Sequence, residues 1–302
     1  SSPKSIYMRL LAKLKSFPGK YMHQNDFLIS AYGVRMPKII YGTAWKQERT
    51  AELVQLAISQ GFRGIDTACQ PKHYNEAGVG EGVAACLNNG LDRNELYLQS
   101  KFTPLNGHDP LRVPYDVKAS LSEQVAQSFQ TSLKNLQTPY LDSLVLHSPL
   151  ADPEQLQEVW QAMEQLFHSG AVKQLGISNC YNLQQFQALY DNATVKPAVL
   201  QNRFYADTQY DLSLRAFCIQ QQVIYQSFWT LTANPGILAD VGVRQLAEKY
   251  HCQPAQVFFR YLTQIGIVPL TGTSSAQHMQ QDLAMFTFAL SEAECKQLTA
   301  LC

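Results

Sequence analysis

The sequence predicts an α/β protein folded as a closed (β/α)8 barrel, and three observations support this prediction. Short apolar segments alternate with helix-like segments along most of the chain, which is typical of a parallel sheet. Eight such units follow one another in about 265 residues, which is the size of a barrel of this kind. No Gly-x-Gly-x-x-Gly lies between the first strand and its helix, which disfavours a doubly wound dinucleotide-binding sheet, the competing fold.

The expected elements follow in order. Residues 27–36 are expected to form an N-terminal β-hairpin around Gly33 that leads into the first barrel strand. The first helix has Thr50 as its expected N-cap and Gly61 as its stop. The barrel strands are predicted at 39–41, 64–66, 96–101, 141–147, 171–178, 198–202, 223–228 and 267–269. The helices are predicted at about 50–60, 76–88, 117–135, 152–170, 182–190, 212–221, 240–250, 254–265, 275–283 and 291–301.

Composition limits the class of protein. With 302 residues and 46% hydrophobic side chains, the chain can bury a large core. Lys+Arg and Asp+Glu balance at 24 each, so no global field favours nucleic acid or an acidic membrane as a partner. The seven cysteines are dispersed and form no Cys-x-x-Cys, which argues against a disulfide framework or a zinc site and for a reducing compartment. These features predict a cytoplasmic protein, with a monomer as the default.

The first 26 residues differ from the rest of the chain. They contain five lysines and arginines against a single acid, Asp26, and residues 6–14 could form a short basic amphipathic helix. A targeting peptide or a membrane-surface segment is one interpretation, and a plain extension beside the domain is the other. The expected organisation is therefore a basic N-terminal extension, 1–26, followed by one barrel domain, 27–302.

Polar side chains are expected at the ends of three predicted strands. Asp66, Lys101 and His147 each end a strand, and Tyr74 follows Asp66 within one loop. Polar groups there are costly unless they are used, and barrel enzymes place their chemistry at the carboxyl ends of their strands. We therefore expect the four side chains to form one site, although each alone also fits an ordinary role, such as a helix cap for Asp66 or a core position for His147.

These four groups suit the reduction of a carbonyl. Tyrosine has an ordinary pKa of about 10, and a nearby ammonium group lowers that pKa. Lys101 could supply the ammonium group, Asp66 could hold it in place, and His147 could direct a carbonyl toward Tyr74 as the general acid. A metal-dependent hydrolase is another barrel alternative, but the sequence shows no His-x-His and no carboxylate cluster at the strand ends, so no metal is expected.

Several motifs, taken together and in order, resemble the signatures of the aldo-keto reductase superfamily over roughly residues 27–300. They are Gly42-Thr-Ala-Trp45, Gly64-Ile-Asp66-Thr-Ala, Tyr74-Asn-Glu76, Ser100-Lys101-Phe, Leu144-Val-Leu-His147-Ser-Pro, Gly176-Ile-Ser178-Asn179 and Gln201-Asn202. The resemblance implies a (β/α)8 barrel that binds NADPH across its C-terminal face and transfers hydride directly to an aldehyde or ketone. It also implies Tyr74 as the acid, Lys101 and Asp66 as its tuning pair, and His147 as the orienting residue.

The resemblance further implies which residues touch cofactor and substrate. Ser178, Asn179 and Gln201 match the residues that hold the carboxamide of the nicotinamide, and Phe228 takes the position of the ring that stacks on it. Trp45 and Trp229 are expected to join His147 in the walls of the substrate pocket, with a buried core position as the alternative. The other expected cofactor positions are Gly42, Thr43, Asp66, Leu231, Thr271, Gly272, Thr273, His278 and Asp282.

The chain departs from the family pattern near the acid and near the cofactor phosphate. The loop before Tyr74 is longer than the commonest form, and its His73 is a rival proton donor. Between Arg260 and Lys296 there is no lysine or arginine, although the family usually binds the 2′-phosphate of NADPH with both. Backbone N–H groups and hydroxyls of residues 271–275 could bind a phosphate instead. NADPH is therefore the expected cofactor, with NADH as the alternative.

A third departure is at the C-terminus, where the chain ends at Cys302, about one residue past its last predicted helix. Family members commonly continue into a loop over the substrate pocket, so we expect a more open mouth or one closed partly by Trp229 and the 230–240 loop. The sequence supports two functions. One is an NAD(P)H-dependent reductase of a small aldehyde or ketone, and the alternative is a non-catalytic cofactor-binding regulatory or scaffold protein of the same fold. The reductase is favoured because a pure binder has no need of Tyr74 and Lys101 together.

Overall fold

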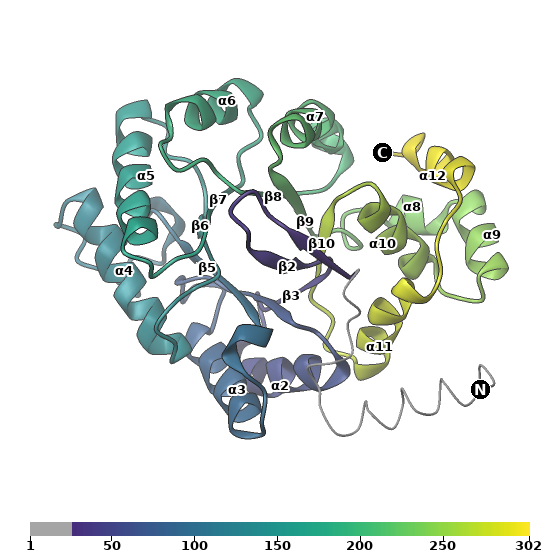
Figure 1. Cartoon of the computed structure of the whole chain (residues 1–302), viewed down its shortest axis with the longest axis horizontal. Coiled ribbons are helices and arrows are strands. Elements are labelled where there is room, and N and C mark those ends of the chain that lie inside the picture. The colour runs from purple at the N-terminus through teal and green to yellow at the C-terminus, as the bar shows by residue number, and fades with distance from the viewer. Residues whose placement is uncertain (1–25) are drawn as a thin grey trace.

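The computed structural model describes residues 26–302, and its parallel strands close into the predicted barrel (Figure 1). The order around the barrel is β10-β3-β4-β5-β6-β7-β8-β9, and β10 completes the circle by pairing with both β3 and β9. This closure excludes the doubly wound open sheet. The barrel strands are β3 (Ile40–Gly42), β4 (Gly64–Asp66), β5 (Tyr97–Phe102), β6 (Ser143–Leu146), β7 (Leu175–Ser178), β8 (Val199–Arg203), β9 (Ile224–Phe228) and β10 (Val268–Thr271).

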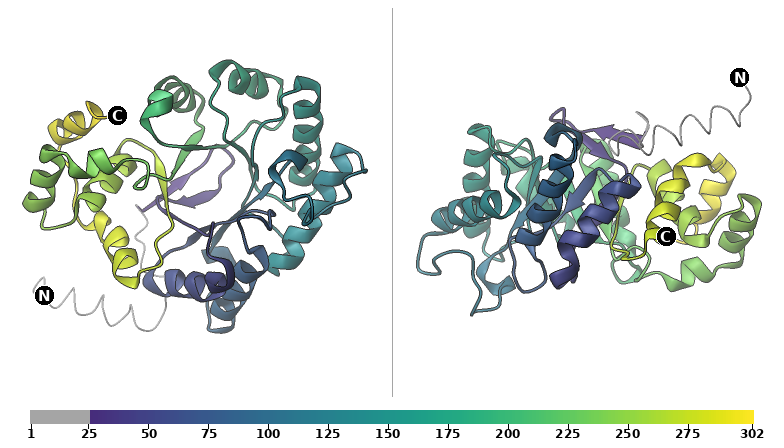
Figure 2. Two further views of the ribbon diagram at one scale, coloured as in Figure 1. Left: turned by 180° about the vertical axis from the view of Figure 1, so that it is seen from behind. Right: turned by 90° about the horizontal axis from the view of Figure 1, so that it is seen from below.

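Helices surround the barrel and bury their apolar faces against it (Figures 1 and 2). The predicted helices agree with the observed ones within a few residues, but the short helix α8 was not predicted. The α-helices are α2 (Thr50–Gln60), α3 (Glu76–Asn88), α4 (Leu121–Leu136), α5 (Pro153–His168), α6 (Leu183–Asn192), α7 (Leu212–Gln221), α8 (Pro235–Ala239), α9 (Val241–Lys249), α10 (Pro254–Gln264), α11 (Ala276–Ala284) and α12 (Glu292–Thr299). Single-turn 3-10 helices occur at Gln47–Arg49, Arg93–Glu95, Leu105–Gly107 and Met285–Thr287, and a longer, kinked one at Ala206–Asp211.

Short polar side chains fix where many of these helices begin. Ser120 and Glu123 form a reciprocal capping box at the start of α4, and Asp152 caps α5 with Pro153 in its first turn. The prediction that Thr50 caps α2 was wrong. Thr50 is the first helical residue, and its hydroxyl donates to the Gln47 carbonyl at 2.7 Å because a 3-10 turn precedes the helix.

The N-terminal hairpin closes one end of the barrel. Strands β1 (Phe27–Ile29) and β2 (Arg35–Pro37) pair antiparallel, as predicted, and lie across the barrel in Figure 1. Met36 of the hairpin is fully buried and packs with residues near the amino ends of the barrel strands, such as Val199 and Val268. The hairpin therefore covers the amino ends of the strands, which leaves their carboxyl ends as the open face.

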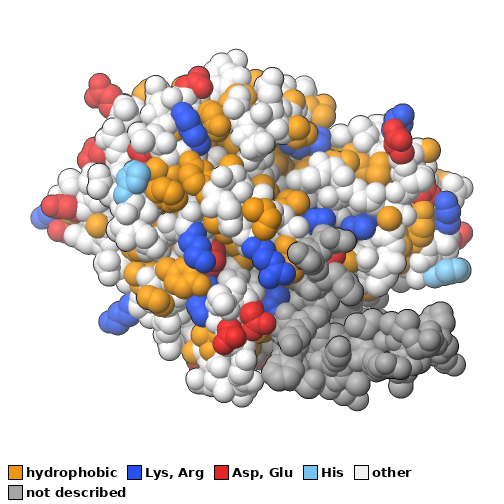
Figure 3. Space-filling model, in the orientation of Figure 1, with side chains coloured by type: hydrophobic (Ala, Val, Ile, Leu, Met, Phe, Trp, Pro, Cys, Tyr) orange, Lys and Arg blue, Asp and Glu red, His pale blue; other side chains and the backbone are white. Residues whose placement is uncertain are grey.

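The predicted basic extension lies outside the described residues except for Asp26, so the division into 1–26 and 27–302 stays a prediction. Within residues 26–302, no helix is both long enough and apolar enough to cross a bilayer. Cationic, anionic and apolar side chains are interspersed over the surface visible in Figure 3, in keeping with the zero net charge.

Candidate active site

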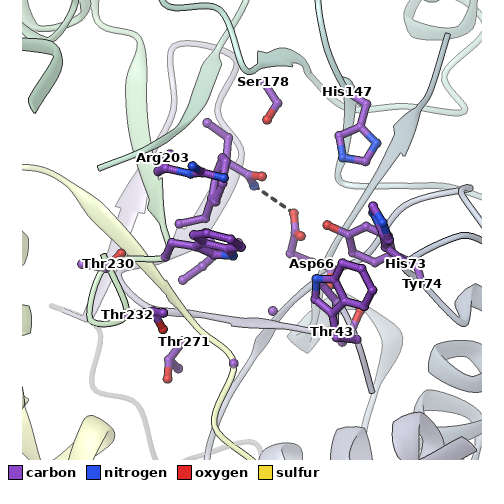
Figure 4. A pocket seen from close by; sticks show the side chains of 18 of the residues that line it. Thr43, Asp66, His73, Tyr74, His147, Ser178, Arg203, Thr230, Thr232 and Thr271 are labelled. Atoms are coloured by element: carbon purple, nitrogen blue, oxygen red, sulfur yellow. Dashed lines mark hydrogen bonds between the residues drawn. The ribbon is translucent and has the colours of Figure 1, made fainter. Parts of the chain in front are cut away.

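A cavity of about 720 Å³ opens at the carboxyl ends of the barrel strands (Figure 4). This is the end of the barrel at which enzymes of this architecture bind their substrates. Its walls come from loops that follow β3, β4, β5, β6, β7, β9 and β10, so residues far apart in sequence share one space. The predicted residues in its walls are Gly42, Thr43, Trp45, Asp66, Tyr74, His147, Ser178, Asn179, Gln201, Phe228, Trp229, Leu231, Thr271, Gly272 and Thr273.

A buried ion pair lies at the floor of the cavity. Lys101 Nζ is 2.7 Å from Asp66 Oδ2 and donates a second hydrogen bond to the Thr67 carbonyl at 2.9 Å. Both side chains are almost fully buried and out of contact with water, so the ammonium and carboxylate groups neutralise each other. Burial alone lowers the pKa of Lys101, but Asp66 and Tyr74 together raise it above its ordinary value, so Lys101 stays charged.

The other carboxylate oxygen of Asp66 organises three glutamines in the barrel interior. Asp66 Oδ1 accepts from Gln99 Nε2 at 2.8 Å and from Gln201 Nε2 at 2.9 Å. A carboxylate only accepts hydrogen bonds, so both amide nitrogens must face it. Gln201 donates its second N–H to Gln226 Oε1 at 2.9 Å, and Gln226 pairs reciprocally with Gln99. The amide orientation of Gln201 is thereby fixed, with its carbonyl oxygen as the end that remains for a ligand in the cavity.

The loop that places Tyr74 is anchored from below. Tyr74 N donates to the Gln70 carbonyl at 3.0 Å, and the Asn75 side chain caps α3 directly after it. The buried Glu76 carboxylate then accepts hydrogen bonds from Ser100, Ser132 and Asn135. These contacts tie the start of α3 to β5 and α4, so the longer loop still delivers Tyr74 to the floor of the cavity.

Tyr74 lies between the buried lysine and the histidine. Its ring centroid is 5.1 Å from Lys101 Nζ and 5.9 Å from the His147 ring, which it meets edge-on. Lys101 does lower the pKa of Tyr74, as expected, but its effect is not the larger one. Burial raises the pKa of Tyr74 above its ordinary value, and this effect outweighs the opposing effect of Lys101. Tyr74 therefore stays protonated at neutral pH and can donate its proton.

His147 is held in one orientation by β5 and β7. Its Nδ1 is 2.7 Å from the Thr103 hydroxyl, and its carbonyl accepts from Asn179 Nδ2 at 2.9 Å. The Thr103 hydroxyl has no other partner within the described residues, so it can donate to Nδ1 and leave Nε2 with the proton. Burial and the nearby Lys101 charge hold the pKa of His147 well below its ordinary value, so the ring is neutral at neutral pH.

The rival donor His73 also lies in the cavity wall, but against a different partner. Its ring packs against that of Trp45, with 4.0 Å between centroids and 37° between the ring planes, and its carbonyl accepts from the Trp45 backbone N–H. Trp45 and Trp229 are 59% and 49% exposed, so neither takes the core position considered as the alternative. Trp45, Asn179 and Trp229 all have positive φ angles, at 64°, 56° and 53°. Such strained backbone is often found at ligand-binding sites.

Three of the predicted site residues lie outside the cavity walls. Lys101 is beneath the floor, and His278 is an exposed residue in the first turn of α11, whose N–H is capped by Ser275. Asp282 is buried on α11 and accepts from the Thr271 hydroxyl at 2.8 Å. That hydroxyl is therefore directed toward Asp282. At residue 271, the backbone is the group that remains for binding a phosphate.

Asp282 should make the stability of the protein depend on pH. Burial raises its pKa from 3.8 to about 7, so the folded state binds this proton more tightly than the unfolded state. The contribution of Asp282 to the free energy of unfolding is fully present below about pH 4 and is lost as the pH rises through about 7. The free energy of unfolding of Asp282→Asn, relative to that of wild type, should therefore rise by about 2–4 kcal/mol from pH 4 to pH 8.

Urea unfolding of both proteins at each pH measures this gain. The Asp207→Asn variant, which removes an exposed carboxylate, serves as the control. An Asp282→Asn difference that does not vary with pH would contradict the raised pKa.

Two cations in the cavity walls were missed from sequence. Lys46 directly follows the Gly42–Trp45 motif, and its ammonium group donates to the Gly272 carbonyl. Arg203 is two residues beyond Gln201 at the end of β8. The adjacency of each to a recognised motif was the available signal. Among the residues that the structure describes, no group of three or more histidine, cysteine, aspartate or glutamate side chains could hold a metal ion.

The fold and the cavity together define a (β/α)8-barrel enzyme, since a buried cation, a protonated tyrosine and a neutral histidine converge at the carboxyl ends of the strands. The sequence profile described as the Aldo/keto reductase family matches residues 38–222 and 236–302. The chain belongs to the aldo/keto reductase family. It is accordingly an NAD(P)H-dependent oxidoreductase of the aldehyde- and ketone-reducing class.

Individual relatives agree with this assignment. The chain is 29% identical over 310 residues to aldo-keto reductase family 1 member A1 of Gallus gallus, covering 91% of this chain and 88% of that protein. It is 30% identical over 274 residues to the glyoxal reductase of Bacillus subtilis (strain 168), covering 89% and 90%. The crystal structure of a Bombyx mori aldo-keto reductase in complex with NADP superposes with a TM-score of 0.76 at 25% identity, covering 91% of this chain and 92% of that one.

Proposed function

We propose that this protein reduces a small aldehyde or ketone with NADPH, with Tyr74 as the general acid. The observation that supports this most directly is the convergence of Tyr74, Lys101 and His147 over the Asp66 carboxylate in one cavity. When bound, the cofactor supplies the hydride that adds to the carbonyl carbon. The chain itself has to bind both ligands, orient the carbonyl and deliver one proton to its oxygen.

The proton comes from the Tyr74 hydroxyl. As negative charge develops on the carbonyl oxygen, Tyr74 donates its proton and the charge passes to the phenolate beside Lys101. The Lys101 ammonium group is held by Asp66, so it stabilises that phenolate without having to reorganise. His147 Nε2–H directs the carbonyl oxygen toward Tyr74 by donating a hydrogen bond, which its neutral state and its contact with Thr103 support.

The nicotinamide fits the side of the cavity formed by Gln201, Ser178 and Phe228. The Gln201 carbonyl oxygen is available to accept from the carboxamide N–H₂, since its amide nitrogen is already bonded to Asp66 and Gln226. Ser178 offers a hydroxyl from the adjacent strand, and the half-buried ring of Phe228 offers a flat surface for stacking. Asn179 contributes to the carboxamide site more indirectly, because its amide nitrogen donates to the His147 carbonyl and its amide oxygen accepts from the Tyr181 hydroxyl.

Lys46 supplies a cation where the last strand has none. It extends from the loop after β3 to the Gly272 carbonyl, next to the backbone that would receive a phosphate. A phosphate oxygen is a much stronger acceptor for an ammonium group than a carbonyl, so a bound cofactor should draw Lys46 to itself. This supports NADPH despite the absence of lysine and arginine between Arg260 and Lys296.

The test is a fluorescence titration with NADPH and, separately, NADH, followed by oxidation of each with 4-nitrobenzaldehyde. We expect tighter binding of NADPH and turnover with it. Lys46→Met should weaken NADPH binding about ten- to a hundredfold, the value of one charge-assisted hydrogen bond. The matched control is the exposed Lys134→Met on α4, which should bind as wild type does.

The titration also assigns the contact that Lys46 makes. A loss confined to NADPH places Lys46 on the 2′-phosphate, and an equal loss for NADH places it on the diphosphate. Unchanged affinities would reject the role of Lys46. Cofactor binding without turnover of any aldehyde or ketone would favour the non-catalytic alternative over the reductase.

A further inference from the structure

Arg203 lies one layer above Gln201 on the inner face of the barrel. Side chains alternate along a strand, so Gln201 and Arg203 both face inward while Asn202 between them bonds outward to Asp211. The backbone of Arg203 pairs with that of Phe228 on β9. Figure 4 shows its guanidinium directed into the cavity from the side opposite Tyr74 and His73.

The guanidinium of Arg203 is positioned but not neutralised. Its Cζ lies 4.1 Å from the Trp229 ring centroid and 5.1 Å from that of Tyr205, so two aromatic faces hold it. Within residues 26–302 no carboxylate forms an ion pair with it, and its side chain makes no hydrogen bond. A half-buried guanidinium with five free donors is suited to a bidentate anion such as a carboxylate.

The charges around the cavity favour an anionic ligand. Of the two cations in the described walls, Lys46 is assigned to the cofactor above, and the one carboxylate there, Asp66, is neutralised by Lys101, so Arg203 is the cation left for a further anion. The remaining walls are apolar, aromatic or neutral polar side chains. A carbonyl compound that also carries a carboxylate would therefore be attracted to the cavity and oriented in it.

We propose that Arg203, held against Trp229, binds the carboxylate of the substrate, so that the preferred substrates are aldehydes or ketones with a carboxylate group. This inference rests on the carbonyl reduction proposed above and adds a substrate class to it. The carboxylate is bound on one side of the cavity while the carbonyl is presented to Tyr74 and His147 on the other.

The position of Arg203 favours the substrate over the cofactor phosphates as the source of the anion. Arg203 lies above the Gln201 amide and beside Phe228, at the side where the nicotinamide fits. Lys46 and the backbone of residues 271–273 are on a different wall, and Figure 4 shows Thr271 well separated from Arg203.

The test compares 4-carboxybenzaldehyde with methyl 4-formylbenzoate, which adds one methyl group and carries no charge. Wild type should have a higher kcat/KM for the acid, and this advantage should shrink as ionic strength rises. Arg203→Met should lower kcat/KM for the acid roughly ten- to a hundred-fold and lower that for the ester much less, as expected for one charge-assisted contact. Arg203→Lys should retain part of the preference, since it keeps the charge but loses the planar fork.

Arg35→Met is the matched control, because Arg35 also lies on an aromatic ring, at 3.6 Å from Phe27, but on the closed end of the barrel. It should leave both substrates unaffected. Equal losses for acid and ester in Arg203→Met, or no preference for the acid in wild type, would overturn the inference. A weaker NADPH affinity of Arg203→Met with the acid preference intact would also overturn the inference, because it would assign Arg203 to the cofactor. Turnover of the ester tests the reductase function separately.

Discussion

Tyr74→Phe is expected to abolish carbonyl reduction while NADPH still binds. The substitution removes only the hydroxyl, so the ring keeps its place beside Lys101 and His147. The loss of a general acid costs about 10²–10⁴-fold in rate, and the loss should appear in kcat rather than in cofactor affinity. Single-turnover oxidation of NADPH by 4-nitrobenzaldehyde and a parallel fluorescence titration measure the two quantities.

Two controls make this result specific. Tyr140→Phe removes a hydroxyl at the start of the barrel strands, where the ring contacts Arg93 and Lys173, and should leave activity unchanged. His73→Gln tests the rival donor and should retain turnover, since the His73 ring packs against Trp45. Retained reduction in Tyr74→Phe, or its loss in His73→Gln alone, would falsify the assignment of Tyr74 as the acid.

Lys101→Met is expected to destroy activity and also to destabilise the fold. Methionine replaces the ammonium group with a similar volume but leaves the buried Asp66 carboxylate with amide donors alone. Removing one partner of a buried ion pair costs about 3–5 kcal/mol in the free energy of unfolding. The same change removes the charge that stabilises the Tyr74 phenolate, so kcat should fall by at least about a hundredfold.

The double variant Asp66→Asn/Lys101→Met separates the two effects. It no longer buries an unpaired charge, so it should recover most of the lost stability in urea unfolding while remaining inactive. Lys249→Met is a matched control, because that lysine pairs with Glu294 at 2.7 Å but is 61% exposed, and it should lose little stability. A stable, active Lys101→Met variant would contradict the role of the ion pair.

Much of the architecture was predictable because it depends on local patterns. The alternation of apolar strands and capped helices places each barrel strand within a few residues of its observed bounds. The largest differences in where a strand starts are at β6 and β7, whose predicted starts at 141 and 171 extend beyond the ladder. There Leu141 and Val172 pair only through an isolated bridge, so the apolar run continues after regular pairing ends.

The strand-end residues were predictable for a related reason. In a parallel barrel all strands end on the same side, so Asp66, Lys101 and His147 could be placed together from sequence order alone. The pKa values at the site could not be predicted in this way. Whether burial or Lys101 dominates the pKa of Tyr74 depends on how deeply the loop after β4 packs, and in the structure burial dominates.

The sequence by itself thus determined the barrel, its face for chemistry and the polar groups at its strand ends, because periodicity and strand order are properties of the chain. Only the tertiary structure brought Lys46 to Gly272, 226 residues away, and placed Arg203 over Trp229. It alone also joined Gln99, Gln201 and Gln226 around Asp66. Such contacts arise from barrel closure, which sets side chains of distant strands against one another without leaving a local pattern in the sequence.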